Sequence, residues 1–295
     1  MALFLLMSER GFSQQLVHKQ PPKVHEVLTP DGLNLNVQEW GNPEGIEILF
    51  IHGAFQSHLS WSQQFNSDLS DDFRIVTYDA RGHGYSDKPV SAEYYREGKR
   101  WADEVKAVID QTGLKNPTVV AWSYGGRMIS DYLSVYGDEA IAGINFVAAL
   151  TNASLNAVTA AGPAAVGMMS DDLLTNLEST RAFLRFCFAK QPSQSDFENM
   201  VGFNMLNPVA VRKLMGGRPT PYEATLRQIK VPVLVTHGVE DQAVDIGISR
   251  YTAATVDGAD TSFYEGVGHS PFWEEPDRFN RELRTFAREN ARQAS

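Results

Sequence analysis

The sequence is poor in cysteine, in basic residues and in long apolar runs. The chain of 295 residues has a single cysteine, Cys187, so it can form no internal disulfide. Cys187 lies in the apolar segment RAFLRFCFAK, which predicts a buried small hydrophobic side chain. Lysine and arginine number 26 against 36 aspartate and glutamate residues, giving a net charge of −10. This balance argues against a general nucleic-acid binder, which needs a basic face, and against binding to anionic membrane surfaces.

No apolar run approaches the roughly 20 residues that a membrane-spanning helix needs. The first segment, MALFLLMSER, has an apolar run from Ala2 to Met7 that is too short for a signal peptide, and no basic residue precedes it. Translation from Met1 or from Met7 stays open. Residues 1–22 are predicted to form an N-terminal extension, and a cytoplasmic protein without membrane association is the expectation.

Apolar segments alternate with helical ones along most of the chain. Residues 23–41 predict a β-hairpin around a Pro-Asp-Gly turn. Six further runs have strand character: residues 46–53, 73–79, 118–123, 140–150, 231–238 and 261–268. The first three have the apolar content that is typical of strands buried on both faces. Helical spacing is found in residues 101–113, 124–136 and 276–290. This alternation predicts an α/β fold with a mostly parallel central sheet flanked by helices on both sides.

One interval breaks the alternation. Between Leu150 and Tyr222 the sequence predicts only helical pieces. We interpret residues 151–222 as a helical cap inserted into a core formed by residues 23–150 and 223–295. Asp171, Asp172 and Ser195 are expected at N-cap or first-turn positions of the cap helices.

The predicted cap is rich in large apolar side chains. Some are expected to form the core of the cap and others to line an apolar substrate pocket: Met168, Met169, Phe183, Phe186, Phe203 and Met205. Arg181 and Arg185 lie four residues apart on an expected helix. They form either a solvated face or a clamp for a carboxylate, and the first interpretation is preferred.

The segment TVVAWSYGG has a serine where a buried strand meets a helix. Ser123 is flanked by small residues two positions away on each side, Ala121 and Gly125. A nucleophile on such a sharp turn has a strained backbone, and small residues at these positions avoid a clash. The turn also brings the hydroxyl to a helix N-terminus, which stabilises a developing anion. The same pattern occurs in an ordinary strand-to-helix turn, so the serine needs partners before it can be interpreted as a nucleophile.

The loops after the last two strands supply candidate partners. A serine hydroxyl needs a base to take its proton, and His269 follows the last strand. Asp241 follows the preceding strand and would orient the imidazole of His269. Glu240 and Asp245 are rival acids, but Asp241 is preferred because it lies three residues after the glycine that ends the strand. The chain order nucleophile, acid, base is that of hydrolases built on this sheet.

An oxyanion hole needs two backbone N–H donors near the nucleophile. One is expected from Tyr124, directly after Ser123. The other is expected from the segment IHGAF, with Ala54 preferred over Phe55. His52 in the same segment is expected to pack the loop.

The sequence resembles the α/β-hydrolase superfamily from about residue 23 to residue 290. The segments that carry the resemblance are IHGAF, YDARGHGYSD, AWSYGGR, THGVEDQ and GVGHSPFWEEP. The second of these is similar to the esterase, perhydrolase and epoxide-hydrolase branch, which implies structural roles for Asp79 and His83. Epoxide hydrolases and haloalkane dehalogenases carry aspartate at the nucleophile position, so Ser123 argues against both activities.

The resemblance implies a serine hydrolase that cleaves a small-molecule carboxylic ester through a Ser123–His269–Asp241 triad and an acyl-enzyme. It implies no metal and no organic cofactor. Hydrolysis of carbon–carbon bonds in diketones, lactone opening and perhydrolysis are alternatives with the same triad. A ligand receptor built on a hydrolase fold is a non-enzymatic alternative. The sequence leaves open the natural substrate, the chain-length preference and the oligomeric state, a homo-oligomer included.

Overall fold

Eight strands form one sheet in the computed structural model, which describes residues 21–156 and 159–293. The strands are β1 (Lys23–Leu28), β2 (Asn34–Gly41), β3 (Ile46–Ile51), β4 (Phe73–Tyr78), β5 (Thr118–Trp122), β6 (Gly143–Val147), β7 (Val233–Gly238) and β8 (Asp260–Tyr264). Their order in the sheet is β1-β2-β4-β3-β5-β6-β7-β8. β2 is antiparallel to both of its neighbours, and all other pairs are parallel. The predicted, mostly parallel sheet is therefore confirmed, whereas the extension up to residue 20, with Met1 and Met7, lies outside the described residues.

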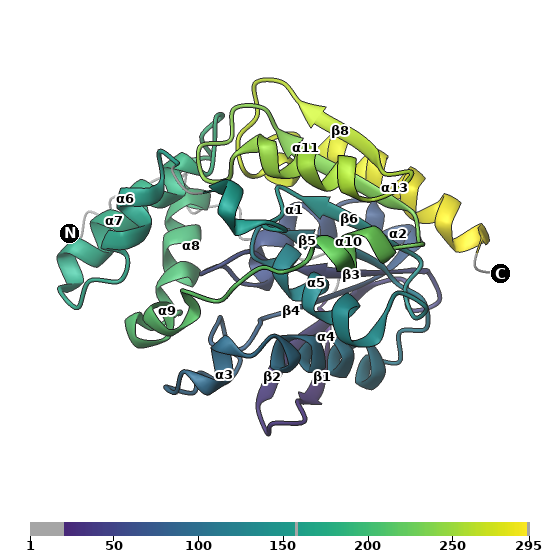
Figure 1. Cartoon of the computed structure of the whole chain (residues 1–295), viewed down its shortest axis with the longest axis horizontal. Coiled ribbons are helices and arrows are strands. Elements are labelled where there is room, and N and C mark those ends of the chain that lie inside the picture. Colours follow the sequence, from purple (N-terminus) through teal and green to yellow (C-terminus); the bar gives the residue numbers. More distant parts are fainter. Residues whose placement is uncertain (1–20, 157–158, 294–295) are drawn as a thin grey trace, which may run out of the picture.

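Helices cover both faces of this sheet (Figure 1). On one face lie α4 (Gly98–Thr112), α5 (Gly125–Tyr136), α10 (Glu223–Gln228) and α11 (Ile246–Thr255). On the other face lie η1 (His58–Trp61), α1 (Ser62–Phe65), α2 (Leu69–Asp72), α12 (Pro271–Glu274) and α13 (Pro276–Gln293). The remaining helices are α3 (Glu93–Arg96), η2 (Ala153–Asn156), α6 (Gly162–Gly167), α7 (Leu173–Phe186), α8 (Gln194–Met205) and α9 (Val209–Met215).

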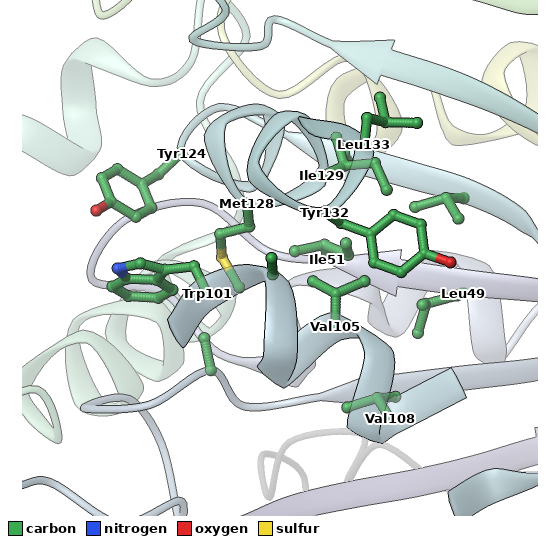
Figure 2. Close-up of a cluster of buried hydrophobic side chains, with 14 of the residues drawn as sticks. Leu49, Ile51, Trp101, Val105, Val108, Tyr124, Met128, Ile129, Tyr132 and Leu133 are labelled. Carbon is green, nitrogen blue, oxygen red and sulfur yellow. The ribbon is translucent and has the colours of Figure 1, made fainter. Parts of the chain in front are cut away.

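The packing of α4 and α5 on β3 fixes the start of α5, two residues after Ser123. Trp101, Val105 and Val108 of α4 recur at helical spacing and are fully buried. Figure 2 shows their side chains facing those of α5 and of Ile51 in β3. Each such side chain contributes about 1.5–3 kcal/mol by leaving water. Gly113 ends α4 in the left-handed conformation, with its N–H on the carbonyls of the last turn.

The chain between β6 and β7 adds no strand to the sheet in the described residues. Its helices α6, α7, α8 and α9 gather at one end of the molecule (Figure 1, left). Asp172 caps α7 by accepting the Thr175 N–H at 2.8 Å. Ser193 caps α8, and Ser195 lies in the first turn of that helix. These four helices are named here the inserted helices.

The inserted helices have a small apolar core of their own, which includes Cys187. The Cys187 side chain is buried, as predicted. Arg181 forms two hydrogen bonds with Glu198, at 2.9 and 2.6 Å. The guanidinium of Arg185 lies 3.7 Å above the ring of Phe197. Both arginines thus contact partners within the inserted helices and lie on the solvent-exposed side of these helices. This agrees with the preferred interpretation of a solvated face.

Candidate active site

Ser123 lies on a strained turn at the carboxyl end of β5. Its φ is +53°, in the left-handed region that costs a non-glycine residue of the order of 1–3 kcal/mol. The turn is held by the neighbouring strand, because the Ser123 N–H donates to the Val147 carbonyl at 2.9 Å. The Ser123 carbonyl accepts the Gly126 and Leu150 N–H groups, each at 2.9 Å. The surrounding backbone therefore imposes the strained conformation.

A small residue is needed two positions after Ser123. A Cβ atom on Gly125 would lie 2.7 Å from the Ile51 carbonyl oxygen and 3.0 Å from that of His52. Both oxygens belong to the backbone of the adjacent chain segment and have little room to move. The close approach of α5 to the end of β3 thus explains the glycine that the turn pattern predicted at this position.

Asp241 and His269 form a buried pair beside this edge of the sheet. His269 Nδ1 lies 2.7 Å from Asp241 Oδ2, and the Asp241 side chain is fully buried. Its other oxygen accepts the backbone N–H groups of Ala243 and Val244 at 2.8 and 2.9 Å. Burial would raise the pKa of Asp241, but attraction to His269 and hydrogen bonds from His237 and His269 lower the pKa overall. Asp241 is therefore an ionised carboxylate at neutral pH.

The residue before the serine holds the loop of His269. Trp122 Nε1 donates to the His269 carbonyl at 2.9 Å, and the centroids of the two rings lie 5.3 Å apart. In the described chain no hydrogen bond within 3.5 Å joins the Ser123 hydroxyl to His269. Such bonds are often long in enzymes without substrate and shorten when substrate binds. The structure thus brings Asp241 and His269 into direct contact and links the His269 loop to β5 through Trp122.

The two rival acids lie elsewhere. Glu240 is exposed to solvent. Asp245 caps α11 by accepting the Gly247 N–H at 2.6 Å. Among the described residues neither carboxylate has a recorded bond to His269, so Asp241 is the carboxylate that contacts the histidine.

The backbone N–H groups of the two expected oxyanion donors, Ala54 and Tyr124, differ from the N–H group of Phe55 in their hydrogen bonds. The Phe55 N–H donates to His83 Nε2 at 3.0 Å, so it is not free for a ligand. In the part of the chain that the structure describes, the N–H groups of Ala54 and Tyr124 donate to no protein acceptor. This bonding favours Ala54 over Phe55 as the second donor.

Two neutral histidines hold the turn that contains Ala54. His83 Nδ1 lies 2.9 Å from the Arg81 carbonyl, so it carries the proton and Nε2 accepts from Phe55. Burial, together with the nearby His52, lowers the pKa of His83 to about 3. His52 Nε2 accepts the N–H of Ala80 at 3.0 Å. These bonds tie the turn after β3 to the loop after β4 and agree with a structural role for His83 and a loop-packing role for His52.

Asp79 anchors the same region. Its carboxylate accepts the N–H groups of His58 and Tyr85 at 2.7 and 2.9 Å, and the side-chain amide of Asn36 at 2.8 Å. Burial would raise the pKa of Asp79, but the hydrogen bond and charge of His58 lower the pKa overall. The residue is buried and bonded on both oxygens, in agreement with the structural role that the resemblance implies.

Sequence reasoning missed two residues around the acid and the base. His237 on β7 has its Nε2 2.9 Å from Asp241 Oδ2. Glu274 accepts the Gly268 N–H at 2.9 Å on one oxygen and the Lys190 N–H at 2.7 Å on the other. Both lie in segments that carry the resemblance, but a strand pattern shows only that His237 is buried and cannot show what it contacts.

A small cavity of about 10 Å³, room for about one water molecule, lies between the inserted helices and the sheet core. Two of its lining residues, Trp122 and Ser270, are the chain neighbours of Ser123 and His269. The other lining residues are Gln56, Ser60, Leu184, Cys187, Phe188, Met200, Phe203, Phe272 and Trp273. None of the lining side chains is charged at neutral pH, because burial raises the pKa of the Cys187 thiol well above its ordinary value. The lining of this cavity therefore favours an uncharged group.

Residues 21–156 and 159–293 contain no group of three or more histidine, cysteine, aspartate or glutamate side chains arranged to hold a metal ion. Within the same ranges, no helix combines the length and the apolar character that crossing a membrane requires.

Proteins of the α/β-hydrolase class have a mostly parallel sheet with a serine on a sharp turn after one strand, and an acid and a histidine after later strands. In this chain Ser123 follows β5, Asp241 follows β7 and His269 follows β8. The model of the alpha/beta hydrolase family matches residues 48–282. The chain belongs to this family and is an enzyme of the hydrolase kind.

Individual relatives cover nearly the whole chain. A bifunctional esterase/perhydrolase from Acinetobacter calcoaceticus is 28% identical over 89% of this chain and 99% of its own length. A solved structure from Burkholderia cenocepacia, assigned as an aryl esterase, is 37% identical with a TM-score of 0.86, covering 91% of this chain and 99% of its own. An esterase structure from a Rhodococcus species is 32% identical with a TM-score of 0.84, covering 90% and 98%.

Proposed function

We propose that the protein is a serine hydrolase that cleaves carboxylic esters of small molecules. The observation that carries the proposal is the 2.7 Å contact between His269 Nδ1 and Asp241 Oδ2, on the same sheet edge as the strained turn of Ser123. A proton on Nδ1, held by Asp241, leaves Nε2 as the acceptor that a general base needs.

The proposed reaction has two steps. Ser123 Oγ attacks the ester carbonyl while His269 takes its proton, and the histidine then protonates the departing alcohol. A water molecule, deprotonated by His269, attacks the acyl-enzyme; the bond to Ser123 Oγ breaks, His269 returns the proton to Oγ, and the acid is released. The N–H groups of Ala54 and Tyr124 are proposed to stabilise the oxyanion in both steps. Among the described residues these two N–H groups have no protein acceptor, which supports this role.

The inserted helices are proposed to act as a cap over residues 23–150 and 223–295. They supply Leu184, Met200 and Phe203 to the cavity beside Trp122. We propose that the acyl or alcohol part of the substrate binds at this cavity, with the side chains of its wall moving apart to admit it. Its uncharged lining favours small apolar groups, because a charged group buried there would lack a partner.

Perhydrolysis is a second candidate. It is favoured by the Acinetobacter relative, a bifunctional esterase/perhydrolase that matches 89% of this chain. In this reaction hydrogen peroxide replaces water in the second step, so that the acyl group leaves as a peracid and Ser123 is restored. Structures of meta-cleavage product hydrolases are 20–21% identical and show the fold alone.

The nucleophile is the first point to test. The purified protein is assayed against p-nitrophenyl esters of graded chain length, lactones and a diketone, with hydrogen peroxide present or absent. Ser123→Ala is expected to lower kcat by roughly 10⁴–10⁶-fold, as loss of a triad nucleophile does. A fluorophosphonate should label Ser123 in the wild-type protein and in Ser130→Ala, a control at a buried serine within α5.

Three outcomes contradict the proposal. Label on a residue other than Ser123 excludes this serine as the nucleophile, and so does near-normal turnover by Ser123→Ala. A single turnover with retained product favours a ligand receptor over an enzyme.

A further inference from the structure

A second histidine contacts the carboxylate of the proposed triad. His237 Nε2 lies 2.9 Å from Asp241 Oδ2, the oxygen that His269 also contacts at 2.7 Å. All three side chains are nearly or fully buried. With the N–H groups of Ala243 and Val244 on Oδ1, the carboxylate has four nitrogen neighbours, two at each oxygen.

The surroundings of His237 define its tautomer. Nε2 faces two acceptors, the Asp241 carboxylate at 2.9 Å and the Val244 carbonyl at 3.2 Å. Because neither can donate, Nε2 carries a proton. Nδ1 lies 2.6 Å from the Ser249 hydroxyl on α11, which donates to it when the imidazole is neutral. The Nε2–H of His237 therefore donates to the Val244 carbonyl, with the Asp241 carboxylate oxygen 2.9 Å from the same nitrogen, and α11 fixes the orientation of the ring.

We propose that His237 is a positioning residue of the hydrolase, which orients the Asp241 carboxylate for His269 and takes up part of its negative charge. This inference rests on the proposed function of the triad. Charge that Asp241 shares with His237 is not available to stabilise the imidazolium of His269. Loss of His237 would leave that charge to act on His269, in addition to freeing the Asp241 carboxylate to move.

Few other titratable groups lie near this cluster. The Cys187 thiol lies within electrostatic reach of Asp241 from the end of α7, and its pKa is raised by burial, by Asp241 and by Glu274. It is therefore neutral over the working pH range. Glu274, on α12, is bonded to backbone N–H groups of the His269 loop and of the inserted helices. Its own pKa is raised mainly by burial.

The chain offers a matched pair of variants at this position. Glutamine at 237 can place an amide N–H near the position of Nε2, whereas asparagine reaches only the position of Nδ1, beside Ser249. Both substitutions keep a polar amide in the same buried site. Ser249→Ala is the outer control, because it removes the partner of Nδ1 without changing the group that faces Asp241.

The readouts are the acid limb of the kcat/KM profile and the pH midpoint of the His269 ring resonances, followed by NMR in ¹⁵N-histidine-labelled protein. His237→Asn should move both upward by about 0.5–1 pH unit, the scale of one charge-assisted hydrogen bond. It should also lower the plateau of kcat/KM by about tenfold through misorientation. His237→Gln should recover most of both effects, and Ser249→Ala should show a smaller shift in the same direction.

Two results would overturn the inference. In the first, His237→Asn and His237→Gln lower the melting temperature equally while the His269 midpoint stays at the wild-type value, which indicates a structural role alone. In the second, the midpoint moves downward. The NMR titration needs no substrate, so it tests His237 even if Ser123→Ala shows that the proposed ester hydrolysis is wrong.

Discussion

At the scale of single residues, the strained backbone conformations lie close to the residues of the proposed chemistry. Within the described residues, the non-glycine positions with positive φ are Phe55 at 63°, Ser123 at 53° and Ala148 at 42°. They follow β3, β5 and β6, which are adjacent in the sheet. Strain of this kind persists only where the surroundings enforce it. At Ser123 the enforcing contacts are the hydrogen bonds to Val147 and Leu150.

This strain can be measured at Ser123. Glycine has no Cβ and adopts positive φ without a steric cost, whereas alanine keeps that cost. We expect Ser123→Gly to unfold at higher urea than Ser123→Ala, with a difference of about 1 kcal/mol in the free energy of unfolding. Both variants lack the nucleophile, so activity does not bear on the comparison. An alanine variant as stable as the glycine variant would show that the turn stores no strain.

The assignment of the acid gives a second prediction at this scale. Asp241→Asn should lower kcat by about 10⁴-fold with the fold intact, because an amide can hold the wrong tautomer of His269. Asp245→Asn should leave kcat near the wild-type value, since asparagine caps a helix about as well as aspartate and Asp245 caps α11. The measurement is steady-state turnover beside circular dichroism of each variant. Reversed results would make Asp245 the acid.

At the level of elements, the sequence predicts the sheet better than the helices. Every strand from β3 to β8 lies within or overlaps a strand-like run recognised in the sequence. The central strands have apolar runs because they are buried on both faces, whereas the edge strand β8 is partly exposed. α11, with the sequence IGISRYTAAT, was missed because its β-branched and small residues give weak helical periodicity. The four-residue helices η1, α1 and α2 are too short to show a period. Tertiary contacts, which the sequence does not display, hold these elements.

One carboxylate joins an element of the core to the inserted helices. Glu274 of α12 accepts the Gly268 N–H, next to His269, and the Lys190 N–H, just after α7. It therefore ties the loop of the proposed base to the segment that lines the cavity. Its neighbour Glu275 forms an exposed ion pair with the Lys190 ammonium at 2.6 Å, which supplies a matched control.

Replacing Glu274 should disturb both segments. Glu274→Gln leaves one oxygen for two backbone donors and turns an NH₂ group toward one of them. We expect a loss of about 1–3 kcal/mol in the free energy of unfolding together with a lower kcat, because the loop of His269 is no longer held. Glu275→Gln should cost less than about 1 kcal/mol, as exposed ion pairs do. Thermal unfolding and ester turnover provide the comparison, and equal effects of the two substitutions would show that Glu274 is an ordinary surface carboxylate.

At the scale of the whole molecule, the candidate site draws together segments that are far apart in the chain. Ala54, Ser123, Asp241 and His269 follow β3, β5, β7 and β8, and parallel strands bring such loops to one edge of the sheet. The placement of these four residues could be predicted from the sequence for that reason. The cavity could not, since its wall combines residues 56–60, 184–203 and 270–273, and their contacts depend on how the inserted helices pack.

The cavity wall leads to a prediction about substrate choice. Met200 and Phe203 of α8 line it, whereas Met168 is fully buried in the main core and is not part of the wall. The quantity to compare is kcat/KM for hexanoate esters divided by kcat/KM for acetate esters. Met200→Ala and Phe203→Ala should raise this ratio by about 10–200-fold, because a few methylenes in an apolar pocket are worth that much. Met168→Ala should lower the free energy of unfolding by about 2–5 kcal/mol and leave the ratio unchanged. The measurements are esterase assays with both p-nitrophenyl esters and urea unfolding of each variant. If neither wall substitution moves the ratio by more than about twofold, a methylene-sized pocket is absent from this wall, and substrate choice would lie with the loops near Phe55 and Tyr124.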